Sequence, residues 1–116
     1  MTAEKRPGED PAARAAAAMH QIAAHALESN LARLDRLQSA VLAAGSGTLL
    51  EHEQSEAAHV AHQLVGSAGT FGYGRVSRLA RELEVFFQQD ADQEAVAASA
   101  GKIALMQEDL QGEPDY

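Results

Sequence analysis

One histidine of this chain lies among residues that leave space around it. His62 is followed by Gly66 and then by Gly69, within a segment that otherwise has a helical composition. At about 100° of rotation per residue, His62 points about 130° away from the apolar face of that helix, which consists of Ala57, Ala61, Leu64 and Ala68. Each glycine inside a helix costs roughly 0.5–1 kcal/mol relative to alanine. Their use here indicates that another molecule must come close to the imidazole.

The surface around His62 is suited to contact with a partner. Its neighbours on the helix surface are small or apolar apart from one histidine, and they are Ser55, Ala58, His59, Val65, Gly66 and Gly69. They form a shallow, partly apolar platform. Imidazole is nucleophilic in its neutral form and loses its proton close to neutral pH, so an exposed histidine on such a platform can take part in group transfer.

The first half of the chain predicts helix. Asp10-Pro11 is a helix start signal, because aspartate caps free N–H groups and proline suits the first helical position. The chain is helix-prone from residue 12 to 44, and Ser29-Asn30 divides this run into a weakly amphipathic first helix and a stronger second one. Gly45 suits the left-handed position that ends the run. A core-facing stripe recurs at three- and four-residue spacing over Leu27, Leu31, Leu34, Leu37 and Val41.

The second half predicts three further helices. The first runs from about residue 49 to 68 and contains His62, and residues 69–72 form the turn after it, with Phe71 tucked under the bundle. The next, 73–89, has an apolar side and a charged side, the latter made of Arg75, Arg78, Arg81, Glu82 and Glu84. The last begins at a cap in 90–92, and its inward residues are Val96, Ser99, Ile103, Met106 and Leu110.

Four amphipathic helices with short connections predict an all-α fold, an antiparallel four-helix bundle with an additional N-terminal helical segment. We expect a flexible tail over residues 1–10, the bundle over 11–112 and a short tail over 113–116.

Composition excludes several classes of function. The formal net charge of −8 argues against nucleic-acid binding, which needs clustered Lys and Arg. The chain contains no cysteine, which excludes disulfides, thiolate nucleophiles and zinc–thiolate sites. Neither a signal peptide nor a run of about 20 apolar residues is present. We therefore expect a cytoplasmic protein that binds neither nucleic acid nor membrane.

Two segments carry a longer pattern, HQLVGSAGTFG from His62 to Gly72 and VSRLARELE from Val76 to Glu84. They resemble the histidine phosphotransfer (HPt) domain of multistep phosphorelays. In that family a histidine is followed by any residue, leucine, lysine, glycine and a small residue, then by a glycine-bearing turn and a helix with a Leu-Ala-x-x-Leu-Glu-like run. The specific match covers residues 58–84, and the helical layout extends it to about 28–111.

The resemblance implies a phosphoryl carrier rather than an enzyme. His62 would accept a phosphoryl group from a receiver-domain aspartate and relay it to another receiver, and Gly66 would give the receiver room to dock. The partners implied are receiver domains of response regulators or hybrid histidine kinases, which would dock on the platform around His62. This chain offers no carboxylate cluster for a metal, so the receiver would supply the Mg²⁺ that phosphoryl transfer needs.

Val65 lies where the family has lysine. That lysine is thought to position or neutralise the phosphoryl group, whereas valine can do neither. Val65 is either a boundary packing residue or a part of the docking platform. Arg75, Arg78 and His59 are candidates to replace the missing cation, or are solvated surface charges.

Two other interpretations stay open. The chain could be a phosphorylation-independent HPt-like module that binds a receiver or a histidine kinase. It could also be a metal-binding helical bundle, because Glu56 and His59 have the Glu-x-x-His spacing of di-iron carboxylate proteins, with His20, His25 and His52 as further ligands. Such sites need two of these motifs and two more glutamates that project inward, and only one motif is present.

Overall fold

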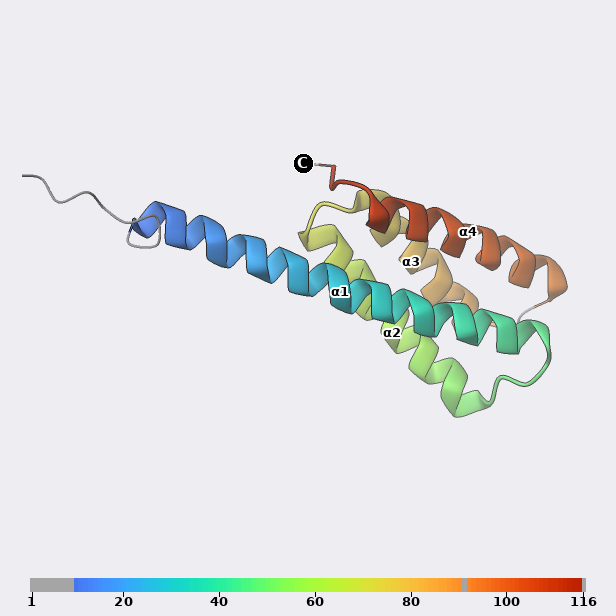
Figure 1. The fold of residues 1–116 in the computed structure, drawn as a ribbon. Coiled ribbons are helices and arrows are strands. Elements are labelled where there is room, and N and C mark those ends of the chain that lie inside the picture. The colour runs from blue at the N-terminus through green and yellow to red at the C-terminus, as the bar shows by residue number, and fades with distance from the viewer. Residues whose placement is uncertain (1–9, 91, 116) are drawn as a thin grey trace, which may run out of the picture.

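The computed structural model describes residues 10–90 and 92–115, which form four α-helices and no strand (Figure 1). The helices are α1 (Pro11–Gly45), α2 (Glu51–Thr70), α3 (Gly74–Phe87) and α4 (Gln93–Gln111). Apart from Asp10, the predicted N-terminal tail lies outside the described residues, as does Tyr116 of the predicted C-terminal tail.

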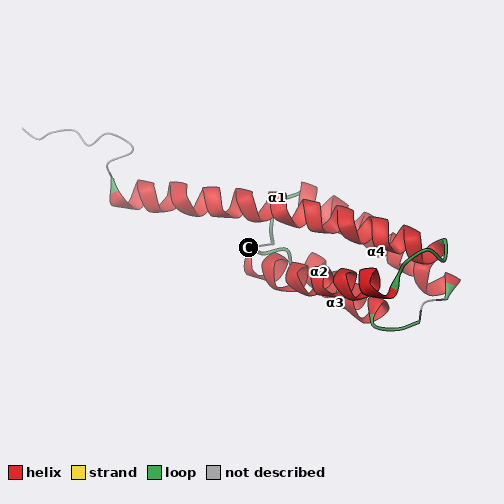
Figure 2. Ribbon diagram, turned by 90° about the horizontal axis from the view of Figure 1, so that it is seen from below, coloured by secondary structure: helices red, strands yellow, loops and turns green. Residues whose placement is uncertain are grey.

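The helices form an antiparallel bundle in which each packs against its neighbours in the chain and α1 closes the ring by packing against α4 (Figures 1 and 2). Helix α3 therefore lies diagonally opposite α1. The predicted all-helical bundle is confirmed, and its additional N-terminal segment is the part of α1 that projects beyond the other three helices (Figure 1). None of the described helices combines the length and apolar character that crossing a bilayer requires.

Helix α1 is continuous over 35 residues, so the predicted division at Ser29-Asn30 is wrong. The alanine-rich flanks have high helix propensity, which outweighs the small cost of one serine and one asparagine. Asn30 also faces the core, where it is fully buried and its Oδ1 accepts a hydrogen bond from Arg33 Nη1 at 2.8 Å. The predicted start is confirmed, because the Asp10 side chain accepts from the Ala12 N–H.

Several helix ends differ from the predicted ones by one or two residues, and two of the differences concern glycines. Gly45 is the last residue of α1, and the left-handed residue after it is Gly47, with a φ of 70°. Helix α2 runs two residues further than expected, to Thr70, so Gly69 lies inside the helix rather than in the turn. Gly72, with a φ of 86°, makes the reversal into α3.

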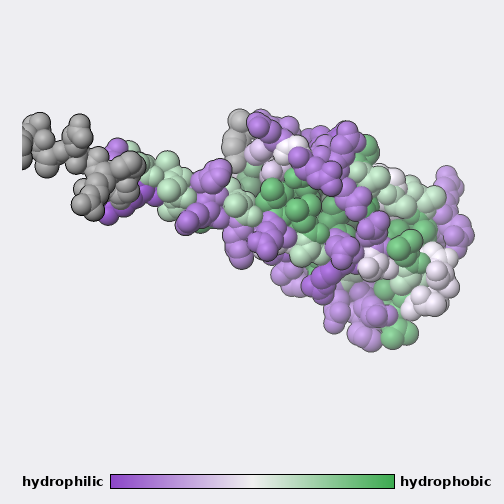
Figure 3. All heavy atoms as spheres, viewed as in Figure 1, coloured by the Kyte–Doolittle hydropathy of each residue, from purple (hydrophilic) through white to green (hydrophobic). Residues whose placement is uncertain are grey.

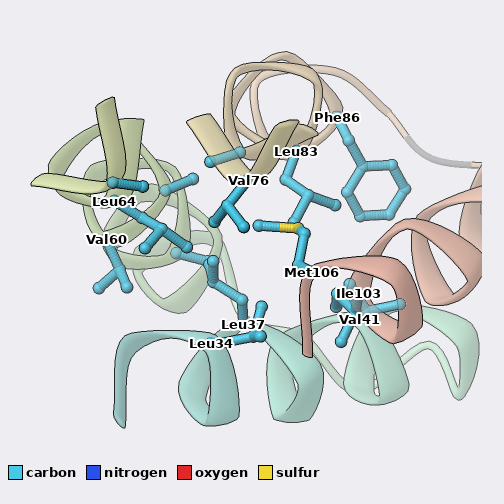
Figure 4. Packing of buried hydrophobic residues seen from close by; sticks show 14 of the residues in the cluster. Leu34, Leu37, Val41, Val60, Leu64, Val76, Leu83, Phe86, Ile103 and Met106 are labelled. Carbon is cyan, nitrogen blue, oxygen red and sulfur yellow. The ribbon is translucent and has the colours of Figure 1, made fainter. Parts of the chain in front are cut away.

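The core is built from all four apolar stripes. Leu34 and Leu37 of α1 and Leu64 of α2 meet Leu83 of α3 and Met106 of α4 in one cluster (Figure 4). The predicted stripe of α1 is wrong at Leu31, which is 39% exposed because it lies at the edge of the core-facing side. Two aromatic residues close the end of the core near the α2–α3 turn, where Tyr73 is buried and Phe71 packs half-buried against the cluster, as predicted for Phe71.

Candidate functional site

His62 lies in the middle of α2 with its side chain 69% exposed, as the sequence predicts. It does not stand alone, because Nδ1 of the imidazole lies 3.0 Å from Oε2 of Glu84 on α3. The Glu84 side chain is only 20% exposed. One ring nitrogen of His62 is thus held by the bundle while the rest of the ring faces solvent.

The antiparallel packing of α2 and α3 brings His62 and Glu84 together. Tyr73 stands midway between them in the chain, eleven residues from each. In a helical hairpin, residues equally distant from the turn lie at the same level. Sequence reasoning placed Glu84 among the outward charges of its helix and missed this contact. The equal spacing about the turn is the signal that could have found it.

The hydrogen bond fixes which nitrogen of His62 is available. An ionised carboxylate can only accept a hydrogen bond. Nδ1 of a neutral His62 ring therefore carries the proton, its N–H donates a hydrogen bond to the Glu84 carboxylate, and Nε2 keeps its lone pair. The exposed nitrogen is then the nucleophilic one, in an orientation set by a side chain from the neighbouring helix.

A second contact fixes how closely the two helices approach. The Ser77 hydroxyl of α3 donates to the Val65 carbonyl oxygen of α2 at 2.7 Å. A Cβ added to Gly69 would lie 3.3 Å from the Ser77 Oγ. Ser77 and Gly69 are also equally distant from Tyr73, so Gly69 provides space for α3 rather than for an external partner.

Gly66 has the opposite environment. No side chain, and no backbone from outside its own helix, lies within 4 Å of a Cβ added at this position. Gly66 is exposed on α2 one turn after His62, and its carbonyl oxygen accepts a hydrogen bond from Thr70 Oγ1 at 2.9 Å. Nothing in the fold of the described residues requires glycine here, so the open space beside the imidazole is available to another molecule.

The remaining platform residues lie on two sides of His62. Ala58 and Val65 are half-buried and pack against the core. Ser55 is exposed and, with Ala58, borders a shallow depression that extends to Phe87 and Gln88 at the end of α3. His59 is exposed but turns toward α1, where it lines a groove with Arg36 and Gln63.

The predicted replacements for the missing lysine do not gather at His62. Arg75 makes a bidentate contact with Asp109 of α4, with Nε and Nη2 at 2.7 and 2.6 Å from its carboxylate oxygens. The hydrogen bonds to Asp109 raise the pKa of the Arg75 guanidinium above its usual value. Within the described part of the chain, His59 and Arg78 make no hydrogen bond or ion pair and are exposed.

Comparison with known proteins identifies the family. The family model of the Hpt domain matches residues 21–113. The chain belongs to the HPt family. The match includes all four helices except the first ten residues of α1. Searches of curated proteins and of solved structures found no match.

The geometry offers no support for the metal-binding alternative. Among residues 10–90 and 92–115, no three His, Asp or Glu side chains gather as a metal site. Glu56 and His59, which have the Glu-x-x-His spacing, are both exposed on α2 rather than directed into the bundle.

The two glycines of the site should respond differently to alanine. We expect Gly66→Ala to raise the free energy of unfolding by about 0.5–1 kcal/mol, because alanine favours the helix and meets no atom there. Gly69→Ala should give no such gain, because the new methyl group crowds a Ser77 hydroxyl already bonded to Val65. Urea unfolding followed by circular dichroism measures both, and equal gains would contradict the assignment of Gly69 to helix packing.

Proposed function

We propose that His62 accepts a phosphoryl group from a receiver-domain aspartate and relays it to the aspartate of another receiver. The observation that carries the proposal is an exposed imidazole whose Nδ1 is held by Glu84 on a surface cleared by Gly66. Family membership supports the same role. The chain is then a phosphoryl carrier whose reaction takes place only in complex with a receiver.

The reaction needs no proton to leave the histidine. Nε2 attacks the phosphorus of the aspartyl phosphate, the N–P bond forms, and the P–O bond to the aspartate breaks as its carboxylate leaves. Nδ1 keeps its proton, so the phosphorylated ring becomes positively charged beside the Glu84 carboxylate. Glu84 thereby stabilises charge that develops during transfer. Transfer to the next receiver follows the same steps in reverse.

The receiver is expected to bring the metal ion. Phosphoryl transfer is promoted by cations that neutralise the equatorial oxygens in an in-line geometry. We therefore place Mg²⁺ on the receiver. We propose that the receiver docks over a surface made of Ser55, Ala58, Val65 and Gly66, with its aspartyl phosphate in line with Nε2 of His62. His59 lies at the α1 side of this surface, and the space beside Gly69 is filled by the Ser77 hydroxyl. We therefore propose that both residues lie outside the main docking contact.

A module that binds receivers without carrying phosphate is the second candidate. Valine at the lysine position favours it, because Val65 packs half-buried and offers no charge to a phosphoryl group. The orientation of His62 by Glu84 favours phosphotransfer, since binding alone needs no fixed ring nitrogen.

Phosphotransfer should depend on His62 alone among the five histidines of the chain. His62→Gln should abolish labelling by a radiolabelled, phosphorylated receiver, while the helical circular dichroism signal stays unchanged. His59→Gln is the matched control one turn away and should be labelled at the native rate. Labelling of the His62→Gln protein would move the site, and unlabelled native protein that still binds the receiver would favour the binding module.

Glu84 should act as a positioning residue for His62. Glu84→Ala should slow transfer about 3- to 10-fold through loss of a partly exposed charge-assisted hydrogen bond. The transfer rate of Glu84→Gln should lie between those of Glu84→Ala and the native protein, because the amide oxygen still accepts a hydrogen bond. Nitrogen-15 NMR of the imidazole should show loss of the Nδ1–H tautomer in Glu84→Ala. Glu82→Gln, which removes a carboxylate of the same helix that is paired with Lys102 rather than with His62, is the control. A native tautomer and rate in Glu84→Ala would contradict the role.

A different arginine is our candidate to replace the missing lysine. Arg81 is exposed, lies three residues before Glu84, and is as far from Tyr73 in the chain as Val65 is. It also borders a groove toward α4, so to meet the phosphoryl group its long side chain must swing toward α2. Residues three apart on a helix are neighbours. Arg81 thus stands at the level of the usual lysine, on the helix that holds Glu84. We propose it as the cation that meets the phosphoryl group.

This role predicts a rescue. Arg81→Gln should slow transfer about 2- to 5-fold, and adding Val65→Lys to it should restore the rate. Both effects should shrink as salt screens the charges. Arg78→Gln, which removes another exposed arginine three residues earlier on α3, should have no effect. If Val65→Lys instead weakens receiver binding and slows transfer in both backgrounds, valine belongs to an apolar docking surface.

A further inference from the structure

The N-terminal part of α1 projects beyond the bundle with large apolar side chains in solvent. From Pro11 to Gln21 every residue is exposed, and Met19 and Ile22 expose 61% and 53% of their surface. Figure 3 shows apolar residues on this projecting segment, between the bundle and the residues drawn in grey. We refer to residues 11–26 as the projecting segment.

The exposed apolar residues continue the core-facing stripe of α1. At about 100° per residue, Ala12, Ala16, Met19 and Ala23 fall within about 40° of the line through the buried residues Asn30, Leu34, Leu37 and Val41. Ala15, Ile22 and Ala26 flank that line. Leu27 still packs against the core, and before it the stripe continues for about 20 Å, from Ala26 back to Ala12, beyond the bundle.

Three of the four polar residues of the projecting segment lie on the opposite side, and the fourth, His20, lies about 70° from the stripe. Arg14, Gln21 and His25 are turned about 150–170° from the stripe, and Arg14 is the only Asp, Glu, Lys or Arg in the segment. Alanine explains why the segment is helical. It does not explain why Arg14, Gln21 and His25 share the side opposite the stripe, which is the pattern of a helix that packs against another.

We propose that the projecting segment pairs with the same segment of a second copy of this chain, in antiparallel orientation. Met19 stands at the midpoint between Ala12 and Ala26, the ends of the uncovered stripe. Antiparallel pairing about this point places Met19 against Met19 of the second copy and Ala12 against its Ala26. In this register the apolar Met19 side chains of the two copies contact each other, and small alanines lie on both sides of this contact.

Charge distribution selects both the partner and the orientation. The chain carries a formal net charge of −8, but the projecting segment holds a single positive charge. It is the part of the chain where two copies can meet without like-charge repulsion. Antiparallel pairing sends the two acidic bundles to opposite ends, separated by much more than the Debye length of about 8 Å. Parallel pairing would place them side by side.

The paired segments leave the candidate site free. His62 faces solvent beside α3, which lies diagonally opposite α1 in the bundle, so a dimer presents two accessible imidazoles. The pairing does not depend on phosphotransfer. Two helical segments of this length bury less than the ~1,200 Å² of a standard interface, so we expect a dissociation constant of about 10 µM to 1 mM.

Sedimentation velocity across about 10 µM to 1 mM tests the association. The native chain should shift from monomer to dimer, and Met19→Glu should stay monomeric with an unchanged helical signal, because it places two carboxylates face to face. Leu42→Glu changes an equally exposed residue of α1 outside the projecting segment and should dimerise like the native chain. A native chain that is monomeric at 1 mM, or a Met19→Glu dimer, would overturn the proposal.

Cysteine cross-linking tests the orientation, and the chain contains no cysteine to interfere. Under mild oxidation Met19→Cys should form a disulfide-linked dimer, whereas Gln21→Cys, at nearly the same level on the opposite side, should not. Ala12→Cys meets its own copy only in a parallel pair and should also stay monomeric. Rapid cross-linking of Ala12→Cys would overturn the antiparallel arrangement.

Discussion

The close approach of α2 and α3 is the constraint on which the candidate site depends. Ser77 bonds to the backbone of α2 at Val65, and Gly69 leaves room for that hydroxyl. With the helices held at this separation, Glu84 lies within hydrogen-bonding distance of His62. A larger residue at Gly69 would separate the two helices at the turn and weaken a contact two helical turns away. The two glycines of the motif therefore serve different purposes, one inside the fold and one outside it.

The contact with Glu84 also decides the electrostatics of the site. A cation beside His62 would help bind a phosphoryl group, whereas a carboxylate beside Nδ1 favours a ring that carries positive charge after Nε2 has reacted. The first effect acts on the phosphoryl oxygens and the second on the imidazole. A site with valine at the lysine position can keep the stabilisation of the charged imidazole by Glu84 while it lacks the cation that lysine would place beside the phosphoryl oxygens. In the proposed mechanism the first effect then has to come from Arg81 and from the metal ion that we expect on the receiver.

The sequence was sufficient for the fold and for the exposure of His62, because both follow from the 3.6-residue period of apolar positions. It was not sufficient to predict the contact between Glu84 and His62. Helical periodicity assigns each residue to a side of its own helix, but it does not say which residues of another helix that side contacts. The same limit explains why Gly69 was predicted to make space for a partner, whereas in the structure Ser77 of α3 lies against it. The division at Ser29-Asn30 failed for another reason. Local propensity marked a boundary, but the alanine-rich flanks favour helix on both sides of it, and α1 continues through Asn30.

Helix α1 shows how one sequence pattern has two structural outcomes. Its apolar stripe is covered where α2 and α4 run beside it and uncovered where they end, although the spacing of apolar residues is the same in both parts. The residues differ in size, with leucine and valine in the bundle and mainly alanine beyond it. Large side chains fill the space between several helices, whereas alanines allow two helices to approach closely. The change from leucine to alanine along one stripe therefore separates a part that forms a core from a part suited to pairing with a single helix.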